Sequence, residues 1–241
     1  MGLWGEPNMP TGNGKRNRIL QRLSPPDYEA IRTELEPVSL SFKEELYEQG
    51  SRIEHMYFVE SGVVSMVTDL EDGGTIETGI IGREGVIGLP AFFGMTGASG
   101  RAFCQIAGSA NRIRIQRMVA ERERNSPLAQ LVLRTANAIM SMLAQTAACN
   151  RAHPVEERTA RWLLMTHDRV DGDEFPLTQE FLAQMLGVRR PSVNTAGLAL
   201  QNAGLIRYSR GKITILNRQG LEASSCECYA FIASEFERAL K

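Results

Sequence analysis

Residues 177–200 constrain the fold more than any other stretch, because apolar residues recur there every three or four positions on both sides of Gly187. This spacing predicts two short helices that pack on each other through a turn at the glycine. Thr178 is a typical N-cap residue and predicts where the first helix begins. The second helix is expected over 189–201. The apolar residues are Phe181, Leu182, Met185, Leu186, Val193, Ala196 and Leu200.

The far face of the second predicted helix is polar. Arginine pairs bidentately with guanine, and asparagine pairs with adenine, in the major groove of DNA. Outward arginine and amide side chains at the start of a helix therefore predict a helix-turn-helix that reads DNA. Pro191 stands in the first turn, where a missing N–H costs little. The outward residues are Arg189, Arg190, Ser192, Asn194 and Thr195.

Two short β-rich runs, 205–208 and 212–215, follow this helix and predict a hairpin, the wing of a winged helix-turn-helix. From 178 to 217 five basic residues stand against one acidic residue, whereas the whole chain has a net charge of −1. The positive charge is therefore concentrated where phosphates would lie. A generic small domain would also show the helix periodicity, but the polar face and the basic wing together favour DNA binding.

Composition limits the class of protein. The chain has 241 residues, 43% hydrophobic and 23% charged, which is enough for two domains with separate cores. It has no apolar run of membrane-spanning length and no secretory leader, so we expect a cytoplasmic protein without membrane contact. Its four cysteines do not form a disulfide scaffold, and we expect them to be reduced.

The first half of the chain changes from helical to strand patterning. Residues 1–16 predict a disordered tail, and short helices are expected over 19–23 and 27–35. The β-rich runs that follow predict an effector-type domain over 17–125, a sheet closed into a roll able to hold a small ligand. The expected strands are Ser39–Phe42, Arg52–Val59, Val63–Asp69, Thr75–Gly82, Ala102–Ala107 and Arg112–Gln116, with turns at Gly50, Ser61–Gly62, Asp72–Gly74 and Gly108.

The longest helical pattern runs from 126 to 149, with residues alternating at four and three positions. Such a heptad seam pairs with the same helix of a second copy, so we expect a dimerisation helix and hinge over 126–153. The alternative is a helix packed only on its own roll. The expected dimer contacts are Leu128, Val132, Thr135, Ile139, Met142 and Thr146.

His153-Pro154 ends that helix, because proline cannot continue it. A further helix over 155–170 then leads to the helix pair, and a closing helix is expected over 219–240 after the wing. The predicted winged helix-turn-helix DNA-binding domain, with this C-terminal helix, therefore covers 154–241.

A roll, a long helix, a hinge and a winged helix-turn-helix in this order resemble the Crp/Fnr superfamily of bacterial transcription regulators. The motifs are Arg158-Thr-Ala-Arg-Trp-Leu-Leu164, Leu177-Thr-Gln-Glu-Phe-Leu-Ala-Gln-Met-Leu-Gly-Val-Arg-Arg-Pro-Ser-Val193, Gly204-Leu-Ile206, Arg210-Gly-Lys212 and Tyr57-Phe-Val-Glu-Ser-Gly-Val63. The resemblance covers roughly residues 18–216. It implies an α+β fold with an N-terminal cyclic-nucleotide-binding-like β-roll, a long dimerisation helix and a C-terminal winged helix-turn-helix.

By this resemblance, Thr178, Ser192 and Lys212 would hold phosphates, and Arg190, Asn194 and Thr195 would face base edges. Where the cyclic-AMP-responsive branch carries glutamate and arginine on the reading helix, this chain has Pro191 and Thr195, so its operator should differ. The full set of expected DNA contacts is Thr178, Gln179, Arg189, Arg190, Ser192, Asn194, Thr195, Ser209, Arg210 and Lys212.

The effector side departs further from the family. Cyclic-nucleotide binders have Gly-Glu-Leu where this chain has Gly85-Val86-Ile87, and their phosphate-binding arginine is one position away from Arg101. On a strand, a shift of one residue turns the side chain to the other face. We therefore expect no response to cyclic AMP, although Arg101 could meet another anion or lie solvated on the surface. The candidate pocket residues are Glu84, Val86, Arg101 and Leu143.

The cysteines do not match the oxygen-sensing branch, which holds an iron–sulfur cluster near its N-terminus, because the first cysteine here is Cys104. If the closing helix folds back on the hinge, Cys149, His153, Cys226 and Cys228 could bind zinc or form a redox pair. Buried cysteines without a function are the commoner case, so no metal site is assigned from sequence.

The resulting expectation is a homodimeric regulator that binds a pseudo-palindromic operator, with half-sites about 10 to 11 base pairs apart. The expected partners of such a protein are double-stranded DNA and, as a further candidate, RNA polymerase. Its DNA binding would be controlled by an unknown small effector or a redox signal. An enzyme of the cupin type is disfavoured, because its metal site needs clustered imidazole and carboxylate ligands and His55 is the only histidine in the predicted roll. A ligand-binding module that acts on a protein partner is the remaining alternative.

Overall fold

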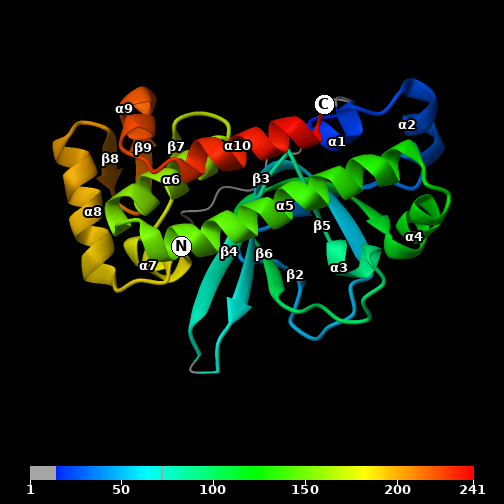
Figure 1. Ribbon diagram of the computed structural model, residues 1–241, viewed down its shortest axis with the longest axis horizontal. Helices are drawn as coiled ribbons and strands as arrows, with labels where there is room; N and C mark the ends of the chain where they lie inside the picture. Colours follow the sequence, from blue (N-terminus) through cyan, green and yellow to red (C-terminus); the bar gives the residue numbers. More distant parts are fainter. Residues whose placement is uncertain (1–14, 72) are drawn as a thin grey trace. The chain divides into compact units, whose positions relative to one another are not determined.

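The computed structural model describes residues 15–71 and 73–241, so most of the predicted tail and Asp72 of the predicted turn lie outside the described residues. The chain packs as two compact units (Figure 1). The first contains residues up to Met66, Ile81–Ile139 and Phe236–Lys241. The second contains Val67–Ile80 and Met140–Glu235. The division into roll, dimerisation helix and DNA-binding domain by the boundaries predicted above stays a prediction.

The first unit is built on a six-stranded sheet in the order β1-β6-β3-β4, with β2 paired antiparallel to β6 and β5 antiparallel to β3. Strand β1 also pairs antiparallel to β6. Short helices precede and follow its strands. The strands are β1 (Glu36–Leu40), β2 (Glu45–Tyr47), β3 (His55–Asp69), β4 (Thr75–Ile81), β5 (Val86–Ile87) and β6 (Arg101–Arg114), and the helices are α1 (Arg18–Gln21), α2 (Pro25–Arg32), α3 (Leu89–Phe92) and α4 (Ile115–Glu123). The predicted β-roll is confirmed.

Two of the predicted turns are wrong, because Ser61–Gly62 and Gly108 lie inside the long strands β3 and β6. A Cβ at Gly62 would lie 2.4 Å from the carbonyl oxygen of Ile106, and a Cβ at Gly108 would lie 2.1 Å from that of Ser61. Both glycines are therefore needed for the close approach of two strands, and Gly62 also has a φ of +80°, which favours glycine. The last predicted strand is also partly wrong, because α4 begins at Ile115.

The second unit holds the helix pair and the wing. Its three-stranded sheet has the order β7-β9-β8 and is antiparallel. The elements are the carboxyl-terminal half of α5 (Pro127–Ala152), α6 (Val155–His167), β7 (Glu174–Pro176), α7 (Gln179–Leu186), α8 (Arg190–Asn202), β8 (Ile206–Ser209), β9 (Lys212–Ile215), α9 (Arg218–Ala223) and most of α10 (Cys228–Ala239). The α+β fold with a C-terminal winged helix-turn-helix is confirmed.

The closing helix predicted over 219–240 is two helices, with the break at 224–227. The hydroxyl of Ser224 donates to the carbonyl of Gly220 at 2.9 Å, and that of Ser225 donates to the carbonyl of Glu222 at 2.8 Å. Serine side chains that bond the backbone in this way compete with a continuing helix. The break places Cys226 in the connection and Cys228 at the first residue of α10.

The predicted dimer seam on α5 stays a prediction. Its six side chains are all buried within the single chain: Leu128, Val132, Thr135, Ile139, Met142 and Thr146. A different stripe of α5 is exposed, with Met140 64% and Leu133 41% accessible. Both stripes contain apolar residues at helical spacing, so periodicity identifies the helix but not which stripe faces inward.

Within the described residues, no helix is long and apolar enough to cross a membrane.

Candidate DNA-binding surface

Helices α7 and α8 form the predicted helix-turn-helix. The hydroxyl oxygen of Thr178 accepts a hydrogen bond from the N–H of Phe181 at 3.1 Å, so Thr178 caps α7 as expected. Gly187 ends α7 with φ at +62°, a conformation that favours glycine. Helix α8 begins at Arg190, one residue later than predicted. Its inner face is buried, as the apolar spacing requires.

The outer face of α8 is open to solvent. Arg189, Arg190, Asn194 and Thr195 are exposed, and Ser192 is half-buried. Asn194 is also oriented, because the side-chain amide of Gln179 donates to its Oδ1 at 3.0 Å. One lone pair of that oxygen and both amide N–H groups of Asn194 stay available to a ligand. The hydroxyl of Thr195 donates to the carbonyl of Pro191 at 3.1 Å, which leaves its oxygen as an acceptor.

The wing is a hairpin with a two-residue turn at Arg210 and Gly211. Both residues have positive φ, +51° and +75°, as a type I′ turn requires. The hydroxyl of Tyr208 donates to the carbonyl of Leu177 at 2.7 Å, and the N–H of Leu177 donates to the carbonyl of Gly211 at 2.8 Å. These bonds fix the wing beside the start of α7. Arg210, Ser209 and Lys212 are exposed on it.

Two residues of this surface were not predicted from the sequence. Tyr208 fixes the wing, and burial raises the pKa of its hydroxyl. Glu174 on β7 forms an ion pair with Lys212, with Oε1 and Nζ 2.8 Å apart, and the hydrogen bond from Lys212 holds the pKa of this carboxyl below its usual value. The alternating pattern of the wing strand was only a weak indication of the role of Tyr208. The ion pair of Glu174 depends on the register of β7 on β9, which the sequence does not contain.

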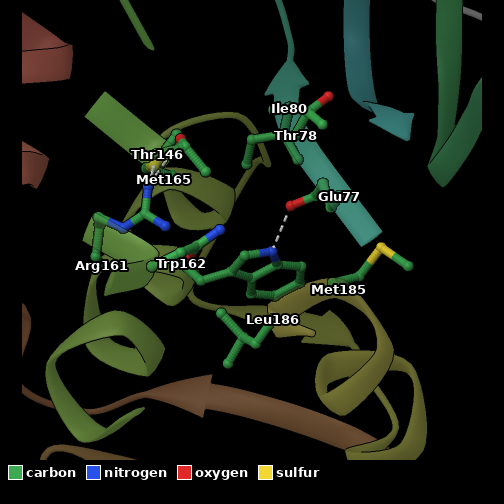
Figure 2. A pocket seen from close by; sticks show the side chains of 11 residues that line it. Glu77, Thr78, Ile80, Thr146, Arg161, Trp162, Met165, Met185 and Leu186 are labelled. Atoms are coloured by element: carbon green, nitrogen blue, oxygen red, sulfur yellow. Dashed lines mark hydrogen bonds between the residues drawn. The ribbon is translucent and has the colours of Figure 1, made fainter. Parts of the chain in front are cut away.

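Helix α6 supports the helix pair from behind. The guanidinium of Arg158 is buried and donates to the carbonyl of Leu186 in the last turn of α7, and burial lowers its pKa. Figure 2 shows Trp162 of the same helix pointing to Glu77, whose Oε1 accepts from the indole N–H at 2.7 Å. Glu77 lies on β4, in the hairpin segment that belongs to this unit. The same small pocket is lined by Arg161, which donates to Thr146 at 3.4 Å.

The predicted effector residues are divided between the two units, and their shared pocket stays a prediction. In the first unit Glu84 is buried and accepts from the N–H of Gly82 at 3.1 Å, and Val86 is fully buried. Arg101 forms an ion pair with Glu45 of β2 at 3.1 Å. Leu143 belongs to the second unit, on α5.

The structure does bring together the four residues of the predicted thiol and imidazole cluster. The ligand atoms of Cys149, His153, Cys226 and Cys228 all lie within 4.8 Å of one another. The pKa of the Cys149 thiol is lowered, first by the hydrogen bond from Cys226. Cys104 is buried in the sheet of the first unit, and burial raises its pKa to about 12.

Comparison with known proteins supports both parts of the fold. A model of the cyclic nucleotide-binding domain matches residues 37–117, and a model of the Crp-like helix-turn-helix domain matches residues 157–224. No curated protein matches the chain.

Several solved structures share this fold over most of the chain. FixK2 from Bradyrhizobium japonicum is 19% identical with a TM-score of 0.68, and the match covers 80% of this chain and 98% of that one. A putative Crp/Fnr-family regulator from Eubacterium rectale is 18% identical with a TM-score of 0.66, covering 85% and 96%. TTHB099, a CRP-family transcriptional regulator from Thermus thermophilus, is 22% identical with a TM-score of 0.65, covering 78% and 96%.

Proposed function

The chain belongs to the Crp/Fnr superfamily of DNA-binding transcription regulators, and from this premise we propose that it binds a two-fold related operator as a homodimer. The observation that carries the proposal is the outer face of α8. Arg190 and Asn194 are exposed one helical turn apart while the opposite face of the helix is buried. A helix with this distribution can enter the major groove without losing its packing.

The side chains of this surface fall into two groups by the chemistry they offer. Arg190, Asn194 and Thr195 face base edges, because bidentate donors and acceptors distinguish base pairs in the major groove. The remaining residues contact phosphates, which positions the protein without reading sequence. The phosphate contacts are Thr178, Gln179, Arg189, Ser192, Ser209, Arg210 and Lys212.

The dimer forms through the exposed stripe of α5 and not through the buried one. Leu133, Asn137, Met140, Ala144 and Ala147 are exposed and follow a spacing of four and three. This is the repeat of a two-stranded coiled coil, and an asparagine within such a seam fixes register and pairing. Two copies joined in this way present two α8 helices to half-sites about one helical turn apart, 10 to 11 base pairs.

The signal that controls this dimer is something other than cyclic AMP. The chain has Val86 where cyclic-nucleotide binders have glutamate, and Arg101 is engaged by Glu45. The regulator works in the cytoplasm, with RNA polymerase as a further partner at the promoter.

Selection from random duplex DNA by the purified protein tests this function. The expected product is an inverted repeat with half-site centres about 10 to 11 base pairs apart, bound by two chains per duplex. Recovery of unrelated sequences, or of a half-site bound by a single chain, would overturn the proposed function.

A further inference from the structure

We propose that Cys149, His153, Cys226 and Cys228 bind one structural zinc ion. This site does not depend on the proposed operator or dimer, because all four residues belong to the second unit of a single chain. The three cysteine side chains form a buried cluster, with Cys149 and Cys228 fully inaccessible to solvent. Three thiols and an imidazole converging in a buried space are the donor set of a Cys₃His zinc site.

The distances fit a tetrahedral ion. With Zn–S bonds of about 2.3 Å and a Zn–N bond of about 2.0 to 2.1 Å, two sulfurs lie about 3.8 Å apart, and a sulfur and a nitrogen about 3.6 Å apart. The Sγ atoms of Cys149 and Cys226 are 3.5 Å apart. The Sγ of Cys228 and the Nδ1 of His153 are 3.6 Å apart. All four atoms lie within 4.8 Å of one another, so the cluster has the dimensions of a site for one ion.

Local structure explains how each pair of ligands reaches the site. Cys149 and His153 are four residues apart, and the N–H of His153 donates to the carbonyl of Cys149 at 3.1 Å, so both side chains lie on one side of the same turn. Cys226 and Cys228 flank the start of α10, after the break at 224–227. The two pairs are far apart in sequence and meet only through the fold.

Neighbouring groups hold the ligands in the orientation that a metal requires. The Nε2 of His153 lies 3.2 Å from a carboxylate oxygen of Glu227, which leaves Nδ1 directed at the cluster. A carboxylate on the far nitrogen of a ligating histidine fixes its tautomer. The amide of Gln145 donates to the Sγ of Cys228 at 3.0 Å. Arg158 and Arg161 on α6 are buried and interact electrostatically with Cys149, so their positive charge offsets the net charge of −1 that three thiolates and Zn²⁺ carry.

The donor set selects the metal and its role. Soft thiolate ligands favour zinc over magnesium and calcium, which bind oxygen. Four protein ligands leave no open position for water or substrate, so the ion is structural. The ion joins two segments of the chain. One is the end of α5 with the turn before α6, and the other is the connection between α9 and α10 with the start of α10. Cys149 and Cys226 of these segments are 77 positions apart. Binding energy at such a site is folding energy of this unit.

The test uses the full-length protein, purified under reducing conditions without added metal and then exposed to one equivalent of zinc or cobalt(II). We expect one zinc per chain by elemental analysis, and cobalt(II) absorption with the strong visible bands of tetrahedral thiolate coordination. Zinc should raise the melting temperature. Cys226→Ala and Cys228→Ala should each abolish the cobalt bands, whereas Cys104→Ala, a matched change of a buried cysteine in the other unit, should retain them.

A second variant keeps the proposal testable if the alanine variants fail to fold. His153→Cys should bind cobalt(II) with a spectrum shifted towards four thiolates, because zinc sites accept Cys₄ as well as Cys₃His. Reduced wild-type protein that binds less than one zinc per chain would overturn the proposal. A second contradicting result would be a Cys149–Cys226 disulfide that forms again after reduction, even when the protein is refolded with zinc present. Neither measurement involves DNA, so a failure of the zinc proposal can be distinguished from a failure of the proposed function.

Discussion

The ammonium of Lys212 lies 2.8 Å from the carboxylate of Glu174, so the wing contains a basic residue that is paired before any DNA arrives. Lys212 lowers the pKa of Glu174, and this carboxyl is therefore ionised at neutral pH. Both side chains are about half exposed, and an exposed pair contributes little to folding. Its effect should instead appear in DNA binding.

Glu174→Gln should tighten binding to all duplexes several-fold, because it releases Lys212 and removes a negative charge from the wing. Because Lys212 contacts phosphate without competition in this variant, the slope of log K against log salt should steepen by up to about 0.9, the value for one complete phosphate contact. Binding measured by fluorescence anisotropy over a salt series checks both effects. The same substitution in a Lys212→Ala background is the control, and an equal gain there would show that the ion pair is not the cause.

Tyr208→Phe should lower the free energy of unfolding by about 1 kcal/mol, because the carbonyl of Leu177 loses its 2.7 Å hydrogen bond. The wing should also lose its fixed position beside α7, which weakens binding to cognate and scrambled duplexes alike. Thermal unfolding and DNA titration measure the two effects. A variant with unchanged stability and unchanged affinity would show that this hydroxyl does not position the wing.

At the scale of elements, the exposed stripe of α5 gives the sharpest test of assembly. Met140→Glu places a charge at an exposed seam position, 64% accessible in the single chain, so folding should be preserved. Dimerisation should be lost, since like charges then face each other across the seam. Analytical ultracentrifugation should show monomers, and operator affinity should fall by more than about tenfold, or 1.4 kcal/mol.

Leu70→Glu is the matched control, because it introduces the same charge at another exposed apolar residue, 44% accessible on the β3–β4 connection. It should leave the dimer intact. A Met140→Glu variant that sediments as a dimer would remove α5 from the interface.

The sequence predicted some of these helices and turns correctly and others wrongly. Helices α7 and α8 were predicted to within a residue or two, because their periodicity, N-cap and glycine turn are local signals. Gly62 and Gly108 were wrongly predicted as turns. The sequence does not distinguish a glycine that makes room for a neighbouring strand from a glycine in a turn. The buried and exposed stripes of α5 could not be told apart, because both contain apolar residues at helical spacing.

At the scale of the whole molecule, the order of roll, long helix and winged helix-turn-helix followed from the sequence because each part has its own period. The exposed residues of α8 were predicted for the same reason. The geometry of the cysteine cluster could not be predicted, because Cys149 and Cys226 are 77 positions apart. The sequence contains only the spacing from Cys149 to His153 and from Cys226 to Cys228. The ion pair between Glu174 and Lys212 also depends on the pairing of β7 with β9, which no local pattern contains.

The central claim is that Arg190 reads a base while the wing contacts only the backbone. It is tested most directly by the affinity of Arg190→Ala for the selected operator and for a scrambled duplex, with Lys212→Ala as control. Arg190→Ala should lose about 1 to 3 kcal/mol on the operator and much less on the scrambled duplex, whereas Lys212→Ala should weaken both equally. Equal losses on both duplexes for Arg190→Ala would contradict the assignment of α8 as the reading helix.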